Sequence, residues 1–437
     1  MRQKDVTVSL PRGRSVTLPL HLTENGPVVT SLERGVNAAA VLKWHGTIPD
    51  GPPEDRSIRA TLAFMKAGSV TDLLEAAGNW KYVSMNFVAA DVDGHIGWHV
   101  CGAAPVRVGY SGRLPGDASA GADWKGFLPF EAMPRLSDPE EGYIATANYR
   151  PEKCPSAPVL SHIWCAPYRY RRIVSALETM RHPGVKDFQA LQMDVHSGQA
   201  DRLLPRLRGF TFEDPRAREA ALVLEGWSRE VTAESAAAAV FEVFLAELIR
   251  RLLAEKLGSD FDLYFSALSY SVENEIFERP GSPLWKGDMK GILSAALSDT
   301  IDFCVSRMGT DRRGWTWGRL HRHAFHHPGA AGKLAEWLLD PAPFPANGDC
   351  NTINVSWSNP VIGSYSVTTI PSMRMIATLG DPDGLLIVGP LGQSGQPGHR
   401  HYDDLTRMWS EGKLVRLPLT EEGVRAAARE KLVLSPG

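Results

Sequence analysis

The chain has 437 residues and a formal net charge of −3, with 43% hydrophobic and 22% charged residues. These values are typical of a globular protein with a sizeable core. They exclude a nucleic-acid-binding protein of the usual basic kind, because stretches such as Arg169 to Arg172 are short and interrupted by apolar side chains.

The N-terminal region alternates polar and apolar residues and lacks the continuous apolar core of a secretory signal. The most hydrophobic region, residues 236–258, carries charges at helical intervals. This pattern predicts a packed amphipathic helix, and no membrane span is expected. The cysteines are scattered and show no CxxC spacing, which predicts neither a disulfide framework nor a zinc site. They are Cys101, Cys154, Cys165, Cys304 and Cys350.

The first 150 residues are predicted to consist largely of strands. The pair Asp93-Gly94 predicts a hairpin turn inside the longest of them. One helix is predicted at about 69–77, with Ser69 as its N-cap. The predicted strands are 6–10, 15–23, 27–32, 39–44, 85–100 and 143–148.

From about 166 to 310 the apolar spacing becomes helical. The predicted helices are 171–180, 188–195, 199–207, 215–257 and 289–306. Strands return at 351–358, 364–379 and 384–390, before a short helix near 402–410. This order predicts an α+β layered fold and a single interwoven domain over 1–437, with both ends contributing to the sheets.

Asn148 ends the predicted strand in the segment GYIATANYRP, just before Pro151. An Asn there is a turn former by residue type, since it hydrogen-bonds its own backbone and tolerates unusual dihedral angles. A catalyst could use the same amide as an N–H donor. Residue type alone favours the turn.

Two other segments contain residue types that are common in hydrolytic sites, but these residues lack the spacing of the known motifs. In HRHAFHH, after a predicted WTWG strand, His321, His323, His326 and His327 could offer metal ligands, but no HExxH frame accompanies them, so a polar surface turn is favoured. The loop GPLGQSGQPG around Ser394 lacks both the GxSxG spacing and a GK[ST] ending, which favours an ordinary turn.

Taken in order, several segments resemble the penicillin acylase family of N-terminal-nucleophile hydrolases over essentially the whole chain. In the first half they are HLTENGPVV, NFVAADVDGHIGWHVCGAAPVR, DWKGFLPFEAMPRLSDPEEGYIATANYRP, APYRYRRIVSAL and LQMDVHSGQADRLLPRL. In the last third they are WTWGRLHRHAFHHP, GDCNTIN, PSMRMIATLGDPDG and GQSGQPGHRHYDDLTRMW. No single motif is decisive, whereas the ordered set is specific.

The resemblance implies the four-layer αββα fold of these hydrolases, here incomplete on the N-terminal side. It also implies an amidohydrolase that cleaves an acyl–amine amide, such as a β-lactam side chain or an acyl-homoserine lactone. The family nucleophile is a Ser at a new N-terminus made by self-cleavage, and its own α-amine acts as the base. The chemistry requires no cofactor.

Two residues match the family's catalytic groups. Asn148 matches the Asn whose side-chain amide donates to the oxyanion, and Arg169 matches the Arg that orients this Asn and the nucleophile's amine. The resemblance therefore favours the oxyanion role of Asn148 over the turn, and the orienting role of Arg169 over an ordinary helix-start ion pair. The motifs also match at Asn86, Trp124, Asp194 and Ser394, which we interpret as structural positions.

The sequence departs from the family at the nucleophile. Ser69 is the only serine of a Gly-Ser pair before Asn148, and its setting is that of a helix cap. We therefore expect the nucleophile, the small subunit and most acidic ligands of the family's structural calcium to come from outside this sequence, for example from a separate polypeptide. The chain alone is then expected to be inactive.

The alternative functions are a truncated or degenerate noncatalytic member that binds or supports other molecules, and a metal-dependent hydrolase using the HRHAFHH cluster. For the amidase, the substrate is a small N-acyl compound whose acyl group can be aromatic, dicarboxylic or long aliphatic. A periplasmic or extracellular location is implied by the family alone, because export cannot be read from this chain.

Overall fold

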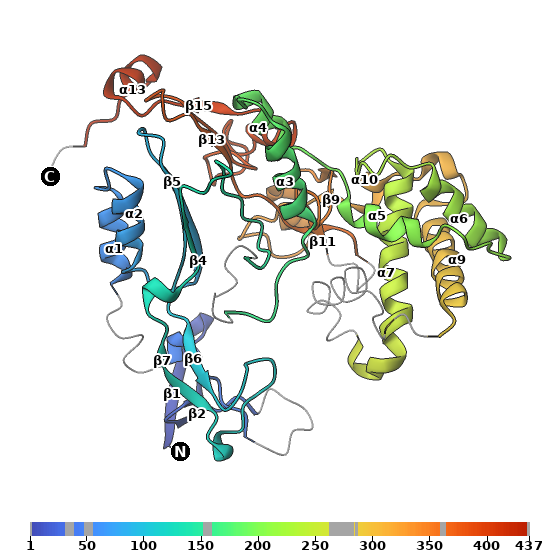
Figure 1. The fold of residues 1–437 in the computed structure, drawn as a ribbon, viewed down its shortest axis with the longest axis horizontal. Helices are drawn as coiled ribbons and strands as arrows, with labels where there is room; N and C mark the ends of the chain where they lie inside the picture. The colour runs from blue at the N-terminus through green and yellow to red at the C-terminus, as the bar shows by residue number, and fades with distance from the viewer. Residues whose placement is uncertain are drawn as a thin grey trace. The chain divides into compact units, whose positions relative to one another are not determined.

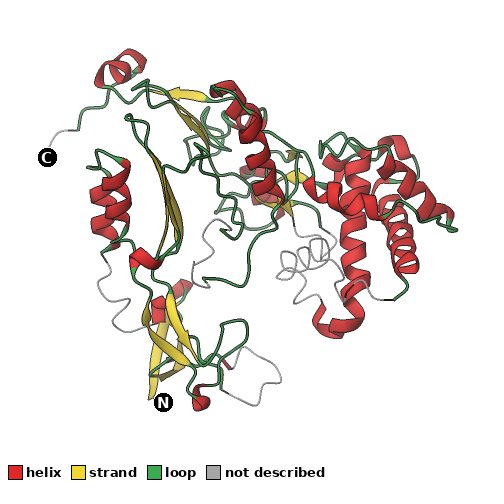
Figure 2. Ribbon diagram, viewed as in Figure 1, coloured by secondary structure: helices red, strands yellow, loops and turns green. Residues whose placement is uncertain are grey.

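The computed structural model describes residues 2–30, 39–47, 56–151, 160–261, 284, 287–358 and 364–434. Figures 1 and 2 show the chain coloured by residue number and by secondary structure. Two compact units are present: Met1–Ile144 with Pro151–His162, and Ala145–Arg150 with Ile163–Gly437. The short segment that contains Asn148 therefore belongs to the second unit. The single domain over 1–437 stays a prediction.

The first unit begins with a β-hairpin that has one apolar and one polar face. Val6 pairs with Leu18 and Val8 with Val16, and these four side chains are between 37% and 54% exposed. On the other face the hydroxyls of Thr7 and Thr17 lie 2.9 Å apart. The strands of this sheet are β1 (Arg2–Ser9), β2 (Ser15–Thr23) and β3 (Gly26–Pro27).

A second sheet of the first unit has the antiparallel order β4–β5–β8 and is covered by α2 (Figure 1). Gly97 makes this packing close, because a Cβ there would lie 2.6 Å from the side chains of Val70 and Leu74. The predicted turn between β4 and β5 is present, with Gly94 at φ 92°. The elements are α1 (Ser57–Phe64), α2 (Val70–Ala77), β4 (Met85–Ala90), β5 (Ile96–Cys101) and β8 (Arg135–Ser137), with a separate pair β6 (Pro105–Val108) and β7 (Asp123–Phe127).

The second unit has its apolar core around α7 (Ala236–Leu257), which packs on α6 (Pro215–Glu225) and α9 (Met289–Met308) (Figure 1). The sequence of α7 is rich in Ala and Leu, which are strong helix formers. Ser235 caps its N-terminus and Gly258 follows its last residue. The other helices are α3 (Tyr168–Thr179), α4 (Val185–Gln192), α5 (Gly198–Leu203), α10 (Trp317–Leu320), α11 (Lys333–Leu339), α12 (Thr406–Ser410) and α13 (Glu421–Ala427).

We expect Ser235→Ala to lower the free energy of unfolding by about 1 kcal/mol, because the Ser235 hydroxyl accepts the Ala238 N–H at 3.0 Å at the start of α7. Chemical denaturation followed by circular dichroism measures this change. Ser235→Asp keeps a capping oxygen and should retain wild-type stability within a few tenths of a kcal/mol. Equal losses in both variants would contradict a capping role.

The strands of the second unit form small antiparallel sheets. The largest has the order β13–β14–β15, and α4 packs on β13, where Gln192 Nε2 donates to the carbonyl of Met375 at 3.0 Å. The strands are β9 (Arg322–His323), β10 (Phe344–Pro345), β11 (Trp357–Ser358), β12 (Val367–Thr369), β13 (Arg374–Ala377), β14 (Leu385–Val388) and β15 (Val415–Leu417).

The α+β prediction is confirmed, while several predicted element boundaries are wrong. The predicted helix 215–257 is two helices, separated after Glu225. Residues 143–148 form no strand, WTWG leads into α10, and most of 351–358 is a loop. In that last segment the polar residues Asn351, Thr352 and Asn354 are buried. The alternation of polar and apolar residues therefore does not correspond to one exposed and one buried face, as it would in a strand.

Within the described residues, no helix is both long and apolar enough to cross a membrane.

Candidate active site

Asn148 lies in an exposed turn and has a left-handed backbone conformation, with φ 60°. Its carbonyl oxygen accepts the Cys165 backbone N–H at 3.0 Å, which ties the turn to the segment leading into α3. The neighbouring Ala147 is buried. Asn adopts this backbone conformation more readily than most other residues with a side chain. Asn148 therefore forms a turn, as its residue type predicted.

Arg169 lies in the first turn of α3 and hydrogen-bonds the side chain of Asn148, with Nη2 donating to Oδ1 at 3.1 Å. A guanidinium group can only donate, so it selects the oxygen of the amide. The Nδ2 group is thereby turned away from Arg169 and has no hydrogen-bond partner among the residues that the structure describes. The structure brings the two predicted residues together, and their catalytic roles stay predictions.

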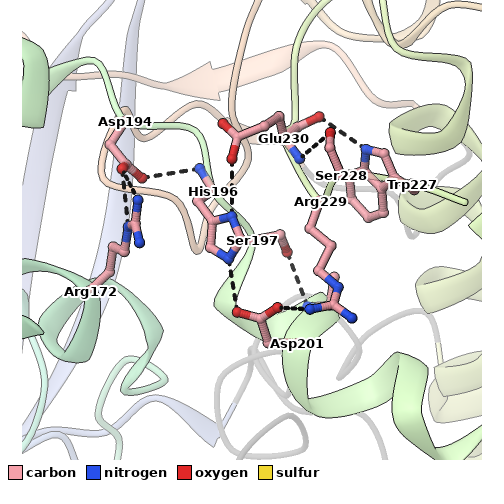
Figure 3. A network of polar contacts seen from close by, with 10 residues as sticks. Arg172, Asp194, His196, Ser197, Asp201, Trp227, Ser228, Arg229 and Glu230 are labelled. Carbon is pink, nitrogen blue, oxygen red and sulfur yellow. Dashed lines mark hydrogen bonds and ion pairs between the residues drawn. The ribbon is translucent and has the colours of Figure 1, made fainter. Parts of the chain in front are cut away.

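One turn further along α3, Arg172 forms an ion pair with Asp194 (Figure 3). The Arg172 Nε and Nη2 groups donate to Asp194 Oδ2 at 3.0 and 2.6 Å. Beside this pair, His196 has Nδ1 3.0 Å from Glu230 Oε1 and Nε2 2.8 Å from Asp201 Oδ2. Sequence reasoning missed Arg172, although it lies in the same motif, RYRRI, as Arg169.

Ser69 is the N-cap of α2, and its hydroxyl accepts the Asp72 N–H at 3.1 Å. The capping role predicted from the sequence is therefore confirmed. The hydroxyl is engaged with the helix backbone, as a structural serine would be.

The other matched positions make structural contacts. The Trp98 indole donates to Asn86 Oδ1 at 2.9 Å, which joins β5 to β4. The Trp124 indole donates to the Tyr110 hydroxyl at 2.7 Å. Ser394 accepts the Gln396 N–H at 3.1 Å within its turn.

The polar surface turn predicted for HRHAFHH is wrong for its first half, because two of the four histidines are buried. His321 and His323 are buried, and burial lowers the pKa of His321 to about 4 and that of His323 to about 3, so both rings are neutral near pH 7. His326 pairs with Asp340, while the His327 ring contacts the Gly395 carbonyl. The described part of the chain contains no group of three or more His, Cys, Asp or Glu residues that could hold a metal ion.

The four described cysteines, Cys101, Cys165, Cys304 and Cys350, are free thiols. Burial raises the pKa of Cys101 and of Cys304 to about 12, which keeps both thiols neutral and unreactive at physiological pH. Cys154 lies outside the described residues.

A buried polar loop at residues 348–356 was not identified as a feature from the sequence, although GDCNTIN is one of the matched motifs. Its centre is Asp349, which is 3% exposed. The Asp349 Oδ1 atom accepts the N–H groups of Asn351 at 2.6 Å and Thr352 at 2.8 Å. Burial nevertheless raises the pKa of Asp349 above its ordinary value of 3.8, and this effect outweighs the opposing hydrogen bonds, including one with Glu242.

Because the pKa of Asp349 is raised in the folded state, the unfolded chain loses this proton first as the pH rises. The contribution of Asp349 to the free energy of unfolding should therefore fall as the pH rises above about 4, by at most about 1.4 kcal/mol per pH unit for one proton. The side-chain amide of the Asp349→Asn variant cannot ionise, and its oxygen can still accept the two backbone N–H groups. The difference in free energy of unfolding between Asp349→Asn and wild type should increasingly favour the variant as the pH rises above about 4 in urea titrations. A difference that does not change with pH would contradict the prediction.

The sequence profile of the penicillin amidase family matches residues 1–426. Acyl-homoserine lactone acylase QuiP of Pseudomonas aeruginosa is 27% identical over an alignment covering 100% of this chain and 57% of that protein. Penicillin acylase 2 proenzyme of Pseudomonas sp. strain SE83 is 29% identical, covering 85% of this chain and 48% of that protein. The chain thus spans about half the length of these relatives.

A solved structure of thermostable penicillin G acylase from Alcaligenes faecalis has a TM-score of 0.71 and 18% identity, covering 100% of this chain and 82% of that one. This likeness confirms the N-terminal-nucleophile hydrolase fold that the motifs predicted. Since the family profile extends over nearly all of the sequence and the fold agrees, the chain belongs to the penicillin amidase family.

Proposed function

We propose that this chain is the greater part of the catalytic subunit of an amidohydrolase of the penicillin acylase type. Its substrates would be small N-acyl compounds in which an acyl group is joined to an amine. Membership of the family supports amide hydrolysis of this kind, and named relatives include acyl-homoserine lactone and penicillin acylases. An N-terminal serine from outside these 437 residues would be the nucleophile.

The observation that carries the proposal is the hydrogen bond from Arg169 to Asn148. It occupies the amide oxygen and leaves the Nδ2 group directed away from Arg169 on an exposed turn. A fixed N–H donor of this kind is what a developing oxyanion requires, because its dipole needs no reorientation during the reaction. The left-handed backbone of Asn148 and the Cys165 contact hold the same turn in place.

In the proposed reaction, the serine hydroxyl attacks the amide carbon and its proton passes to the serine's own α-amine. The carbonyl oxygen becomes an oxyanion, which accepts an N–H bond from Asn148 Nδ2. Collapse of this intermediate breaks the C–N bond, and the amine leaves with the proton. Water then attacks the resulting ester by the same steps and releases the acid.

The remaining parts of the enzyme are also proposals. A separate polypeptide or an adjoining segment would supply the small subunit and the serine, and the family resemblance supports export to the periplasm or beyond. A structural calcium, as in many members, is also part of the proposal, and its acidic ligands would come mostly from outside this sequence, because the described residues contain no group of three or more His, Cys, Asp or Glu that could hold a metal ion. We assign no step to a metal ion.

Expression with and without the coding sequence upstream of Met1 tests the proposal. The upstream DNA should encode a Gly-Ser-Asn strand start in an adjoining or neighbouring frame, and the combined protein should hydrolyse a chromogenic phenylacetyl anilide or an acyl-homoserine lactone. The 437-residue chain alone should be inactive.

Unrelated DNA upstream, together with no activity in any combination, would overturn the amidase and favour a noncatalytic binding protein. Activity of the 437-residue chain alone would contradict the external nucleophile. Loss of that activity with a chelator would then favour the metal-dependent alternative at the histidine cluster.

A further inference from the structure

Arg169 and Arg172 lie one turn apart on α3 but have different partners. Arg169 donates to the Asn148 amide, whereas Arg172 donates through two nitrogens to a single oxygen of Asp194. Residues three apart share one side of a helix. Any displacement of the N-terminal end of α3 therefore moves both guanidinium groups, and with them the amide that Arg169 orients.

Asp194 is held at all of its polar groups. Its backbone N–H donates to the Leu191 carbonyl at 3.2 Å, and its own carbonyl accepts the Asn354 N–H at 2.9 Å. Its Oδ1 atom accepts the His196 N–H at 3.1 Å, while Oδ2 receives Arg172. The side chain is only 16% exposed. These hydrogen bonds restrain the Asp194 carboxylate, so its ion pair with Arg172 can hold α3 in position.

Hydrogen bonds also link Asp194 to the buried core of the second unit. Asn354, which donates to Asp194, accepts Arg374 Nη2 at 2.8 Å through its side chain. Arg374 is 4% exposed, and its Nη1 group donates to the carbonyl of Trp409, which is also buried. A continuous series of polar contacts thus connects the buried Trp409 with Arg172 on α3.

On the other side, Asp194 adjoins the charged network drawn in Figure 3. The His196 ring bridges Asp201 and Glu230, and Arg229 Nη1 donates to Asp201 Oδ1 at 2.6 Å. The segment that carries His196 also pairs with residue 230 by an isolated β-bridge. These contacts restrain the segment directly after Asp194.

We propose that Arg172 and Asp194 are a positioning pair for the oxyanion donor. The pair fixes the first turn of α3 so that Arg169 meets Asn148 Oδ1 and the Nδ2 group faces the substrate. This inference rests on the proposed function, and neither Arg172 nor Asp194 touches the substrate. Their effect passes through Arg169 and Asn148.

The effect of Arg172→Gln on kcat should be large relative to its effect on stability if Arg172 positions the donor. Arg172 is 42% exposed, and ion pairs with so exposed a partner contribute little to folding. A donor displaced by a fraction of an ångström, in contrast, loses part of its transition-state stabilisation. Arg172→Gln should lower kcat about 10-fold, leave KM within about twofold, and lower Tm by about 1–3 °C.

The decisive experiment is a double-mutant cycle in the complete enzyme, with the segment that carries the nucleophile present. In an Asn148→Gly background, Arg172→Gln should lower kcat by less than about twofold, because the side chain through which it acts is gone. Arg172→Lys should restore part of the loss. Arg216→Gln, which breaks an ion pair with Asp302 on α6 and α9, is the matched control and should leave kcat unchanged.

A full loss of about 10-fold in both backgrounds would show that Arg172 acts independently of Asn148 and would overturn the proposal. A second measurement needs no activity: the side-chain amide NMR signals of Asn148 in the 437-residue chain should shift in Arg172→Gln and Asp194→Asn but not in Arg216→Gln. Unshifted signals would also overturn it. Failure of the oxyanion role itself would appear differently, as Asn148→Gly with wild-type activity.

Discussion

Replacing Asn148 with glycine is expected to lower kcat of the complete enzyme by about 10²–10³-fold while changing KM by only a few-fold. Glycine removes the amide but adopts the left-handed backbone of this turn at no steric cost, since φ is 60° here. The loss therefore reports the side chain and not the fold. Steady-state kinetics on one chromogenic amide give both constants, and thermal unfolding checks the stability.

Two further substitutions sharpen this prediction. Asn148→Asp keeps the size, tolerates the same backbone, and should gain an ion pair with Arg169, yet it offers no N–H donor. It should fold as well as the wild type and be at least as inactive as the glycine variant. Asn148→Ala adds the backbone cost of a non-glycine residue, about 1–2 kcal/mol, to the same catalytic loss. An active Asp variant would contradict the donor role.

Replacing Gly348 with alanine is expected to lower the free energy of unfolding by about 2–5 kcal/mol. Gly348 has φ +80°, and a Cβ on it would overlap the Asn354 carbonyl oxygen and lie 2.8 Å from Thr352 Oγ1. The backbone cannot yield easily, because the Gly348 N–H donates to Val231 at 2.7 Å and its carbonyl accepts the Trp317 indole at 3.0 Å. Urea denaturation measures the loss.

Gly209 is the matched control for this substitution. It has a similar φ of +92°, but a Cβ there would meet nothing within 4 Å. Gly209→Ala should therefore show only the backbone cost of about 1–2 kcal/mol. If the two variants lose the same amount, the crowding inferred around Gly348 is wrong.

Helices were predicted better than strands. The 3.6-residue period of apolar side chains marks the buried face of a helix from the local sequence alone, whereas strand pairing depends on distant residues. The segment around α9 was placed within two residues of its observed end, and Ser69 was identified as a cap. The break between α6 and α7 was missed since residues 226–235 continue the apolar pattern through Trp227 and Val231. Their departure from helix depends on tertiary contacts, such as the Val231 N–H donating to Val195.

Strands failed where burial did not follow alternation. In 351–358 several polar residues are buried, and a hydrogen bond such as that from Asn351 Nδ2 to Gln199 Oε1 on α5 is not signalled by any period-two pattern. At Asn148 the predicted strand is a turn, because the left-handed residue and the Cys165 contact set its path. The pairing of Asn148 with Arg169 could be predicted from ordered motifs, but the Arg172–Asp194 pair, 22 residues apart, required coordinates.

The hairpin of β1 and β2 also bears on how the protein would behave in concentrated solution. Its pleat separates Val6, Val8, Val16 and Leu18 from the threonines, so one side of a two-stranded ribbon is difficult to wet. Among the described strands, β1 is also the edge of its sheet, and an edge strand can pair with another chain through its outer backbone groups. This ribbon and the low net charge of −3 would therefore both favour association between chains in concentrated samples.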